Sequence, residues 1–496
     1  MIITFFVILP LLGVFINSLL GRFVKNFSEI FINIVNFLLV VLSFVSLFYI
    51  NTSENITLVY QVGGWVIPYG ITLVMDSLTV FMLLLVNVVG FFVGIYSISY
   101  MKSYTESWGF YSLFELMIAG MNGVIISGDL FNIFVFLEIA SISSYALVAY
   151  GIGKDELEAS FKYIILGSIS TGLILLGIVL TYSYTSTLNL ADIAKTIEFD
   201  RSFILKIILF LFIIGFSVKA AVVPFHWWLP DAHPSAPAPI SAMLSGVLIK
   251  TLGIYLIVRF IFNVFPKNQE ILNIIFYLGI LSMIIGVILA LYQWDYKRLL
   301  AYHSISQVGY MLLGIGLGSP TGIVGGMFHM LNHSIFKSLL FLTSGALEYN
   351  FYTRDLKKYC CVNKIMPNTT FSAVVGSLSI AGVPPFNGFW SKLLIIVACI
   401  ETKNILAAIV AVAVSVLTLA SFLKVLKYGF YSIEDNTKFS ENKKEVPFPM
   451  QFSMLSLAIL CIILGILLYP NINDLLLSKI KSTIYEGSLY YKTILK

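Results

Sequence analysis

Long apolar stretches separated by short polar loops follow one another along almost the whole chain. A helix needs about 20 mainly apolar residues to cross the hydrocarbon core of a bilayer, and fourteen runs come near that length. The predicted spans are residues 2–20, 28–50, 71–98, 109–127, 129–150, 160–182, 204–224, 237–262, 272–292, 298–316, 322–346, 368–400, 405–430 and 450–469. The pattern predicts an all-α, polytopic membrane protein of about 14 transmembrane helices.

Prolines interrupt two of these runs. Pro224 follows the seventh run, and the pair Pro384 and Pro385 lies inside the twelfth. Proline removes a backbone donor and clashes with the preceding helical turn, so both helices are expected to be broken. The segments around the breaks, 223–228 and 383–390, resemble each other at an offset of about 160 residues.

Adding the same offset to the residue numbers of the fourth predicted span gives approximately the position of the ninth, which indicates an internal repeat. We expect residues 109–265 (helices 4–8) and 266–430 (helices 9–13) to form two five-helix units. Five is an odd number, so the second unit is expected to be inverted. Residues 1–108 would supply helices 1–3, and residues 431–496 helix 14 and a C-terminal tail. Inverted repeats with paired broken helices indicate a transport site near the membrane midplane.

The charges in alternate loops predict the orientation. One set holds Arg22, Lys25, Lys102, Lys154, Lys297, Arg298, Arg354, Lys357, Lys358, Lys364, Lys427, Lys438, Lys443 and Lys444. The other set holds only Lys195, Arg201, Lys267 and Lys403, with further lysines in the tail. Because basic loops stay in the cytoplasm, the first set is expected inside and both termini outside, in the cell (inner or plasma) membrane.

Composition narrows the function classes. Hydrophobic residues make up 59% and charged residues 11% of the 496 positions, and the mean hydropathy is +0.94. The net charge of +5 is scattered over loops, which favours membrane orientation over nucleic-acid binding. The four cysteines form no C-x-x-C pair, and no phosphate-binding G-x-x-x-x-G-K-[ST] loop is present. No metal, cofactor or ATP site is therefore expected.

Two charges deep in apolar runs are expected to work together. Glu138 has no basic neighbour in sequence, and Lys219 lies five residues before Pro224. A charge at the bilayer centre costs at least about 2.5–3.5 kcal/mol on insertion scales, so each needs a reason to be there. We predict a Glu138–Lys219 ion pair whose opening changes the proton affinity of the lysine, with carbonyls freed by the break around Lys219. The alternative is a salt bridge that only holds helices together.

Two further buried lysines repeat this spacing. Lys250 lies thirty-one residues after Lys219, and Lys424 lies thirty-two residues after Lys392. We expect Lys250 and Lys392 to take part in proton transfer. Lys424 is close to a predicted cytoplasmic helix end, where a lysine can extend its ammonium to the interface.

All five histidines fall in the same regions. His329, His333 and Lys337 share one helical face and are predicted to form a proton relay. A histidine pair four residues apart is also a metal motif, but neither a base glutamate nor a third ligand accompanies it in the sequence. His226 and His233 could serve as a proton-uptake point or as turn residues. Supporting and direct roles both stay open for Asp76 and Glu115.

The most specific stretches run from Gly128 to Glu138, from Lys219 to Lys250, from His329 to Glu348 and from Gly382 to Lys392. Through them the chain resembles the antiporter-like subunits shared by Mrp-type sodium/proton antiporters, membrane-bound hydrogenases and respiratory complex I. Among these it most resembles the D-type subunit of Mrp antiporters. The resemblance implies fourteen helices, two inverted five-helix units and a polar axis across the membrane plane.

The resemblance also implies which residues carry protons. The acidic and basic groups of that family's polar axis correspond to Glu138 on the fifth helix, Lys219 on the seventh, Lys250 on the eighth, His329 on the eleventh and Lys392 on the twelfth. Some relatives have glutamate at the last of these positions, and lysine there argues against the complex I subunit of that type.

The expected function is proton translocation along a buried Glu/Lys/His axis, with or without sodium/proton antiport, in a multisubunit Mrp-type or redox-driven complex. The expected partners are other membrane subunits, protons, Na⁺ in the antiporter case, and the lipid bilayer. The alternatives are a stand-alone secondary transporter of a small solute, a proton-pumping subunit of a quinone-reducing complex I, and a structural anchor. No catalytic centre is expected, so any enzyme activity would belong to partner subunits of a hydrogenase or NADH:quinone oxidoreductase.

Overall fold

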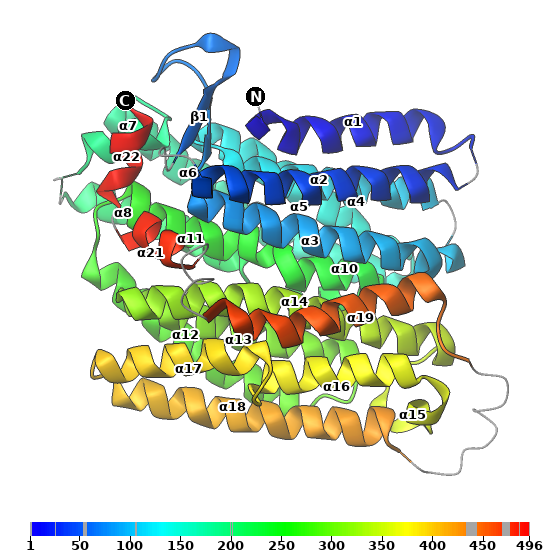
Figure 1. The fold of residues 1–496 in the computed structure, drawn as a ribbon. Helices are drawn as coiled ribbons and strands as arrows, with labels where there is room; N and C mark the ends of the chain where they lie inside the picture. The colour runs from blue at the N-terminus through cyan, green and yellow to red at the C-terminus, as the bar shows by residue number, and fades with distance from the viewer. Residues whose placement is uncertain are drawn as a thin grey trace.

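The protein is a bundle of long helices that run side by side (Figure 1). The computed structural model describes residues 2–24, 26–52, 57–104, 107–198, 200, 202–432, 444–468, 477–485 and 487–495. Of the loop residues that predict the orientation, Lys25, Arg201, Lys438 and Lys443 lie outside this set, as does the end of the last predicted span. Ten helices in the described part are long and apolar enough to cross a membrane.

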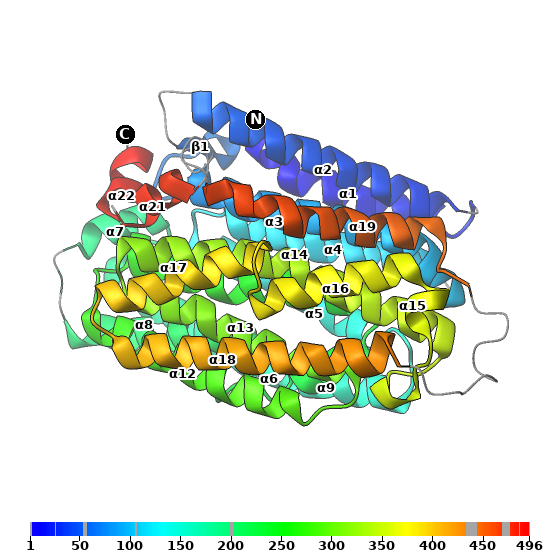
Figure 2. The same ribbon diagram turned by 60° about the horizontal axis from the view of Figure 1, so that its bottom comes forward.

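Three helices open the chain and a fourth packs on them near its end. They are α1 (Phe5–Leu20), α2 (Phe27–Thr52), α3 (Ser77–Tyr100) and α19 (Phe448–Ile463). Figure 2 shows α1 and α2 along one side of the bundle, with α19 beside α3. Many apolar side chains of α1 and α2 face outward, as expected for helices in contact with lipid.

The middle of the chain supplies the next set of helices. They are α4 (Ser107–Ile126), α5 (Leu130–Val148), α6 (Lys154–Thr185), α7 (Leu190–Thr196), α8 (Phe203–Lys219), α9 (Leu229–Ser235), α10 (Ala238–Met243) and α11 (Leu256–Arg259). Three π-helical turns extend α10 and α11 into one continuous helix, Ala238–Val264. This helix is buried along its whole length and forms the centre of the bundle.

The second half of the chain continues the bundle. Its helices are α12 (Gln269–Leu291), α13 (Tyr296–Gly316), α14 (Pro320–Phe351), α15 (Val362–Ile365), α16 (Pro367–Ala381), α17 (Asn387–Glu401) and α18 (Ile405–Val425), which a π-helical turn extends to Phe430. Figures 1 and 2 show α16 and α17 following each other end to end, and α18 along the same face of the bundle.

Both predicted breaks are present. The first separates α8 from α9, and the second separates α16 from α17. Each contains a residue in the left-handed backbone region shortly after the first helix ends, Ala221 with φ 54° and Gly382 with φ 80°. The backbone therefore reverses its handedness locally at each break and leaves the last carbonyls of the preceding helix without helical partners.

One predicted boundary was wrong. The third span was expected to begin at residue 71, but residues Thr72–Met75 form strand β2, which pairs antiparallel with β1 (Leu58–Gln61). The apolar run continues through the strand into the helix, so hydropathy alone does not mark the junction. The helix starts only at Ser77, because the Asp76 side chain accepts a hydrogen bond from the Thr79 N–H and caps it.

Both ends of the chain lie at the hairpin end of the bundle (Figure 1). Two short C-terminal helices, α21 (Leu477–Tyr485) and α22 (Ser488–Ile494), pack there. The loops before α4, α13 and α16 lie at the opposite end, since the helices alternate in direction. The candidate functional residues lie between these two ends.

Candidate functional site

Lys219 ends α8 at the first break, where its side chain is buried. Its Nζ donates to the Ser141 Oγ at 2.9 Å and to the Tyr145 OH at 3.1 Å, both on α5. The expectation that carbonyls freed by the break would surround this ammonium was wrong for Lys219. The side chain extends across to α5 instead, where two hydroxyl oxygens supply the acceptors.

Glu138 lies one helical turn before Ser141 on α5 and is partly buried. It interacts electrostatically with Lys219, but no ion pair within 4.0 Å joins the two side chains in the described part of the chain. The predicted direct salt bridge is therefore not formed in this conformation. The Glu138 Oε1 is buried and has no hydrogen-bond partner among the described residues. The two charges are coupled through space, with Ser141 between them in the helix.

Aromatic side chains fix this first group of residues. The Trp228 Nε1 donates to the Val218 carbonyl at 3.0 Å, which ties the far side of the break to the end of α8. The Trp228 ring stacks on Tyr163 at 4.1 Å, and Tyr163 packs edge-on against Tyr145 at 4.5 Å. These contacts join the break to Tyr145, whose hydroxyl holds Lys219.

Lys250 lies at the centre of the buried helix and is fully enclosed. Its Nζ donates to the carbonyls of Ser245 and Gly246, the latter at 2.7 Å. The surrounding turns are π-helical, so their backbone hydrogen bonds join residues five apart instead of four. The Gly253 backbone of this helix packs directly against Ala220, so Lys250 and Lys219 lie on neighbouring elements.

His329, His333 and Lys337 follow one another on a single face of α14, as predicted. The two imidazole centroids are 6.3 Å apart, and the His329 Nδ1 lies 3.0 Å from the Ser391 Oγ of α17. Lys337 donates to the Leu300 carbonyl of α13. His333 interacts electrostatically with Lys250 as well as with its own neighbours. The face of α14 thus lies opposite Lys250.

Lys392 lies on α17 just after the second break and reaches back into it. Its Nζ donates to the Ile380 carbonyl at 2.7 Å, the Ala381 carbonyl at 3.4 Å and the Ser415 Oγ at 3.1 Å. These carbonyls are the last ones of α16, which the break leaves without helical donors. Backbone solvation of an ammonium, expected at the first break, is found at the second.

The remaining histidines are also buried. The His303 Nε2 lies 2.8 Å from the Ser421 Oγ, and the His233 ring packs on Phe341 at 4.7 Å. The His226 ring packs on the Trp227 ring instead. Lys424 donates to two carbonyls of the α12–α13 connection, at Leu291 and Gln293.

Several polar atoms along this line have no protein partner. In the described part of the chain these buried atoms belong to His226, His233, His303, Gln307, His329, Asn332, His333 and Asn387. Buried polar atoms are normally bonded to protein or to ordered water. A row of such atoms between charged groups is what a hydrated proton path requires. Gln307, Asn332 and Asn387 were missed from the sequence because single amides give no pattern there.

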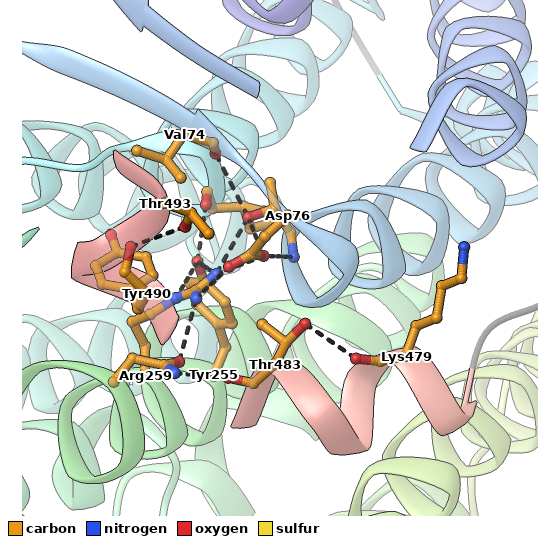
Figure 3. Close-up of polar contacts among 11 residues, drawn as sticks. Val74, Asp76, Tyr255, Arg259, Lys479, Thr483, Tyr490 and Thr493 are labelled. Atoms are coloured by element: carbon orange, nitrogen blue, oxygen red, sulfur yellow. Dashed lines mark hydrogen bonds and ion pairs between the residues drawn. The ribbon is translucent and has the colours of Figure 1, made fainter. Parts of the chain in front are cut away.

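A buried ion pair near the hairpin was also missed (Figure 3). The Arg259 guanidinium donates to both carboxylate oxygens of Asp76, at 2.6 and 2.9 Å. The Tyr490 ring of α22 lies over the guanidinium at 5.1 Å, and Asn263 donates to the Thr483 carbonyl at 2.8 Å. Asp76 therefore forms a buried ion pair, and its partner Arg259 lies on the buried helix 183 residues further along the chain.

Glu115 is a second buried carboxyl outside the main line. It is fully buried on α4, and neither oxygen has a hydrogen-bond partner among the described residues. The side chain of Asn36, on α2, lies near enough to interact with it.

These contacts describe a multi-pass helical membrane protein. A line of ionisable side chains runs through its interior, and two broken helices lie beside that line. That arrangement defines a class of ion-translocating membrane subunits. The chain belongs to the family of antiporter-type membrane subunits of NADH:quinone oxidoreductases and Mrp antiporters, since the model described as "NADH:quinone oxidoreductase/Mrp antiporter, TM" matches residues 127–418. A second model, "NADH-Ubiquinone oxidoreductase (complex I), chain 5 N-terminus", matches residues 61–111.

Individual relatives agree with this family. The chain is 36% identical over 496 residues to the D-type Na⁺/H⁺ antiporter subunit of Alkalihalophilus pseudofirmus, covering 99% of both chains. A chain in the structure of the Mrp complex from Dietzia sp. DQ12-45-1b matches with a TM-score of 0.91 and 26% identity, covering 100% of this chain and 99% of that one. A chain of the membrane-bound sulfane sulfur reductase, an archaeal respiratory membrane complex, matches with a TM-score of 0.91 and 30% identity over 99% of both. The predicted likeness to the D-type Mrp subunit, as a proton-translocating membrane subunit, is confirmed.

Proposed function

We propose that the chain carries protons along the line Glu138, Lys219, Lys250, His333, His329 and Lys392, with Lys337 as a branch of the same line. The observation that carries this proposal is that the ammonium groups of Lys219, Lys250 and Lys392 are buried and donate hydrogen bonds to neutral oxygens. None of the three forms an ion pair within 4.0 Å in the described part of the chain. An ammonium held by hydroxyls and carbonyls keeps a partner after it loses its proton, because the neutral amine still donates hydrogen bonds.

Electrostatic coupling supplies enough energy to move a proton from one group to the next. Two unit charges 4 Å apart at an effective dielectric of about 20 interact by about 4 kcal/mol, which corresponds to about three pKa units. The approach of Glu138 to Lys219 would hold the proton on the lysine. Its retreat would release the proton toward Lys250, whose helix packs against the end of α8.

The architecture that this function requires is fourteen spans in two inverted five-helix units. The units would comprise residues 109–265 and 266–430, preceded by residues 1–108 and followed by 431–496. Two helix breaks of similar construction, with Ala221 and Gly382 in the left-handed region, support such a relation. Each unit would then supply one half-channel, and the buried helix Ala238–Val264 would join them.

The chain would work beside other membrane subunits in a cell-membrane complex, with both termini on the outer side. Two chains that this protein matches over nearly their whole length come from multisubunit complexes, the Mrp complex and the membrane-bound sulfane sulfur reductase. The full-length relative named a Na⁺/H⁺ antiporter subunit supports Na⁺ as the exchanged ion. Redox driving by partner subunits is the second candidate, supported by the respiratory relative.

The test is proton transport by the assembled complex in sealed vesicles. Lys219→Ala and Glu138→Ala are expected to lower transport at least tenfold, because each removes one charge of the first pair. Lys206→Ala is the matched control, since Lys206 pairs with Glu270 at the exposed end of α8. Unchanged transport by Lys219→Ala in a fully assembled complex would refute the proposal.

A further inference from the structure

A cavity of about 620 Å³ opens at the end of the bundle opposite the hairpin. It lies where α3 ends and where α14 ends, and its walls include Tyr100, Lys102, Tyr104, Glu348 and Lys444. Within the described part of the chain its lining is polar and aromatic. By the proposed orientation, this end faces the cytoplasm.

Glu348 stands at the boundary between the cavity and the protein interior. Its Oε2 lies 2.6 Å from the Nζ of Lys297, and the exposed fractions of the two side chains are 28% and 2%. Lys297 also donates to the Ala236 carbonyl at 3.1 Å, next to α9 of the first break. The carboxylate is thus open to water on one side and held by a fully enclosed ammonium on the other.

The position of Glu348 on α14 connects it to the central line. His329, His333, Lys337, Phe341, Ser344 and Glu348 follow at intervals of three and four residues and share one helical face. Lys337 and Glu348 are eleven residues apart, which is about 16 Å along a helix. The Phe341 ring lies between them, in contact with the Lys337 ammonium and the His233 ring. The face leads from the cavity to the buried histidines.

Tyrosine and threonine hydroxyls flank the turns of α14 that lie between Lys337 and Glu348. The Tyr96 OH donates to the Leu342 carbonyl at 2.8 Å, and the Tyr296 OH lies 3.4 Å from the Thr343 Oγ1. Gly345 permits this approach, since a Cβ there would stand 2.9 Å from the Tyr96 OH. Hydroxyls both donate and accept hydrogen bonds, so such a group can pass a proton on.

The cavity wall does not compete for the proton. Burial, together with the negative charge of Glu348, raises the pKa of Tyr104 to about 12. Its phenol therefore stays neutral near pH 7 and serves as a hydrogen-bond donor. Two acidic residues line the described part of the cavity, Glu348 and Glu445. The Glu445 carboxylate accepts hydrogen bonds from the Asn368 N–H and the Thr369 hydroxyl.

We propose that Glu348, paired with Lys297, is the proton-uptake group through which the α14 face draws protons from the cavity. A proton from water in the cavity binds the carboxylate and removes the charge that holds the Lys297 ammonium. The proton then leaves through the hydroxyls toward the next free basic nitrogen on α14, and the carboxylate with its ion pair forms again. This role rests on the proposed function and adds the residue at which protons enter.

An ion pair that only fixes α13 to α14 would have the same geometry, so the test needs a readout that separates the two roles. Glu348→Cys, made in a Cys361→Ser background because Cys361 is the partly exposed native cysteine, removes the carboxylate and allows it to be replaced chemically. Proton transport by the assembled complex is expected to fall at least fivefold. Treatment from the cytoplasmic side with 2-carboxyethyl methanethiosulfonate (MTSCE), which places a carboxylate on the cysteine, should restore at least half of it.

The sulfonate reagent MTSES should fail to restore transport, because it adds a negative charge that can hold Lys297 but binds no proton near pH 7. MTSCE applied only from the outer side should also fail. Equal restoration by both reagents would show that a fixed negative charge suffices, and restoration by neither while Glu348→Asp is also inactive would show a packing role; either outcome overturns the inference. Glu270→Gln removes an exposed carboxylate at the other end of the bundle and should leave transport unchanged.

Two outcomes keep this inference separate from the proposed function. If Lys219→Ala abolishes transport while Glu348→Gln keeps the full rate, the axis stands and the uptake role of Glu348 is wrong. If Lys219→Ala transports normally, both are wrong, because no axis remains for Glu348 to supply.

Discussion

The two broken helices hold their lysines in different ways. At the first break, Lys219 leaves its own helix and is bound by the side-chain hydroxyls of Ser141 and Tyr145. At the second break, Lys392 turns back to the carbonyls of Ile380 and Ala381, with Ser415 as a third acceptor. A site made of side chains can be altered one atom at a time, whereas a site made of backbone depends on the course of the chain. The first site should therefore be sensitive to side-chain chemistry and the second to backbone geometry.

The largest effect is expected from Gly382→Val. Gly382 has φ 80°, and a Cβ there would stand 3.0 Å from the Lys392 Cδ. A left-handed conformation costs an ordinary residue about 1–2 kcal/mol, and the collision displaces Lys392 from its carbonyls. We expect proton transport to be lost, measured in sealed vesicles with assembly checked on native gels. Gly172→Val is the control, because open space surrounds Gly172, and normal transport by Gly382→Val would contradict the backbone dependence of the second site.

A smaller effect is expected at the first site from Tyr145→Phe and Ser141→Ala. Each removes one acceptor of the Lys219 ammonium, and a hydrogen bond to a charged group is worth about 1.5–3 kcal/mol. The rate of proton transport should fall about tenfold in each variant. The double variant should fall by less than the product of the two, since the residues act on the same ammonium. Full additivity would indicate that they act on separate steps.

The smallest effect is expected from Ser415→Ala, the counterpart of Ser141→Ala at the second break. It removes one acceptor of Lys392 and leaves both carbonyls in place. Transport should fall by about twofold, because backbone solvation of the ammonium persists. A loss as large as that of Ser141→Ala would remove the distinction between the two sites.

The long helices and the two helix breaks could be predicted from the sequence. The apolar runs gave the long helices, and Pro224, Pro384 and Pro385 gave the breaks, because both signals are local. Strand β2 was missed since its residues are as apolar as those of the helix that follows. The π-helical turns around Lys250 were also missed, because an apolar run predicts a helix without distinguishing π-helical from α-helical turns.

The sequence predicted which residues form the site better than it predicted which atoms each of them binds. Glu138, Lys219, Lys250, His329 and Lys392 stand out because charge is rare in apolar runs. Which atom each would bind depends on the rotation of neighbouring helices. The ammonium of Lys219 is thus within reach of Ser141, one turn away from the expected carboxylate, while the carbonyls expected around it surround Lys392. No sequence periodicity encodes those rotations.

The contacts of the C-terminal helices α21 and α22 affect the order in which the buried network at this end forms during synthesis. The guanidinium of Arg259 is covered by Tyr490, and Asn263 finds its acceptor at Thr483. These contacts close a network that begins at Asp76. The ribosome therefore delivers the last members of this network more than 200 residues after Arg259. Until residues 483–490 have been made, the nascent chain must keep a charged pair at this end of the bundle without its final cover.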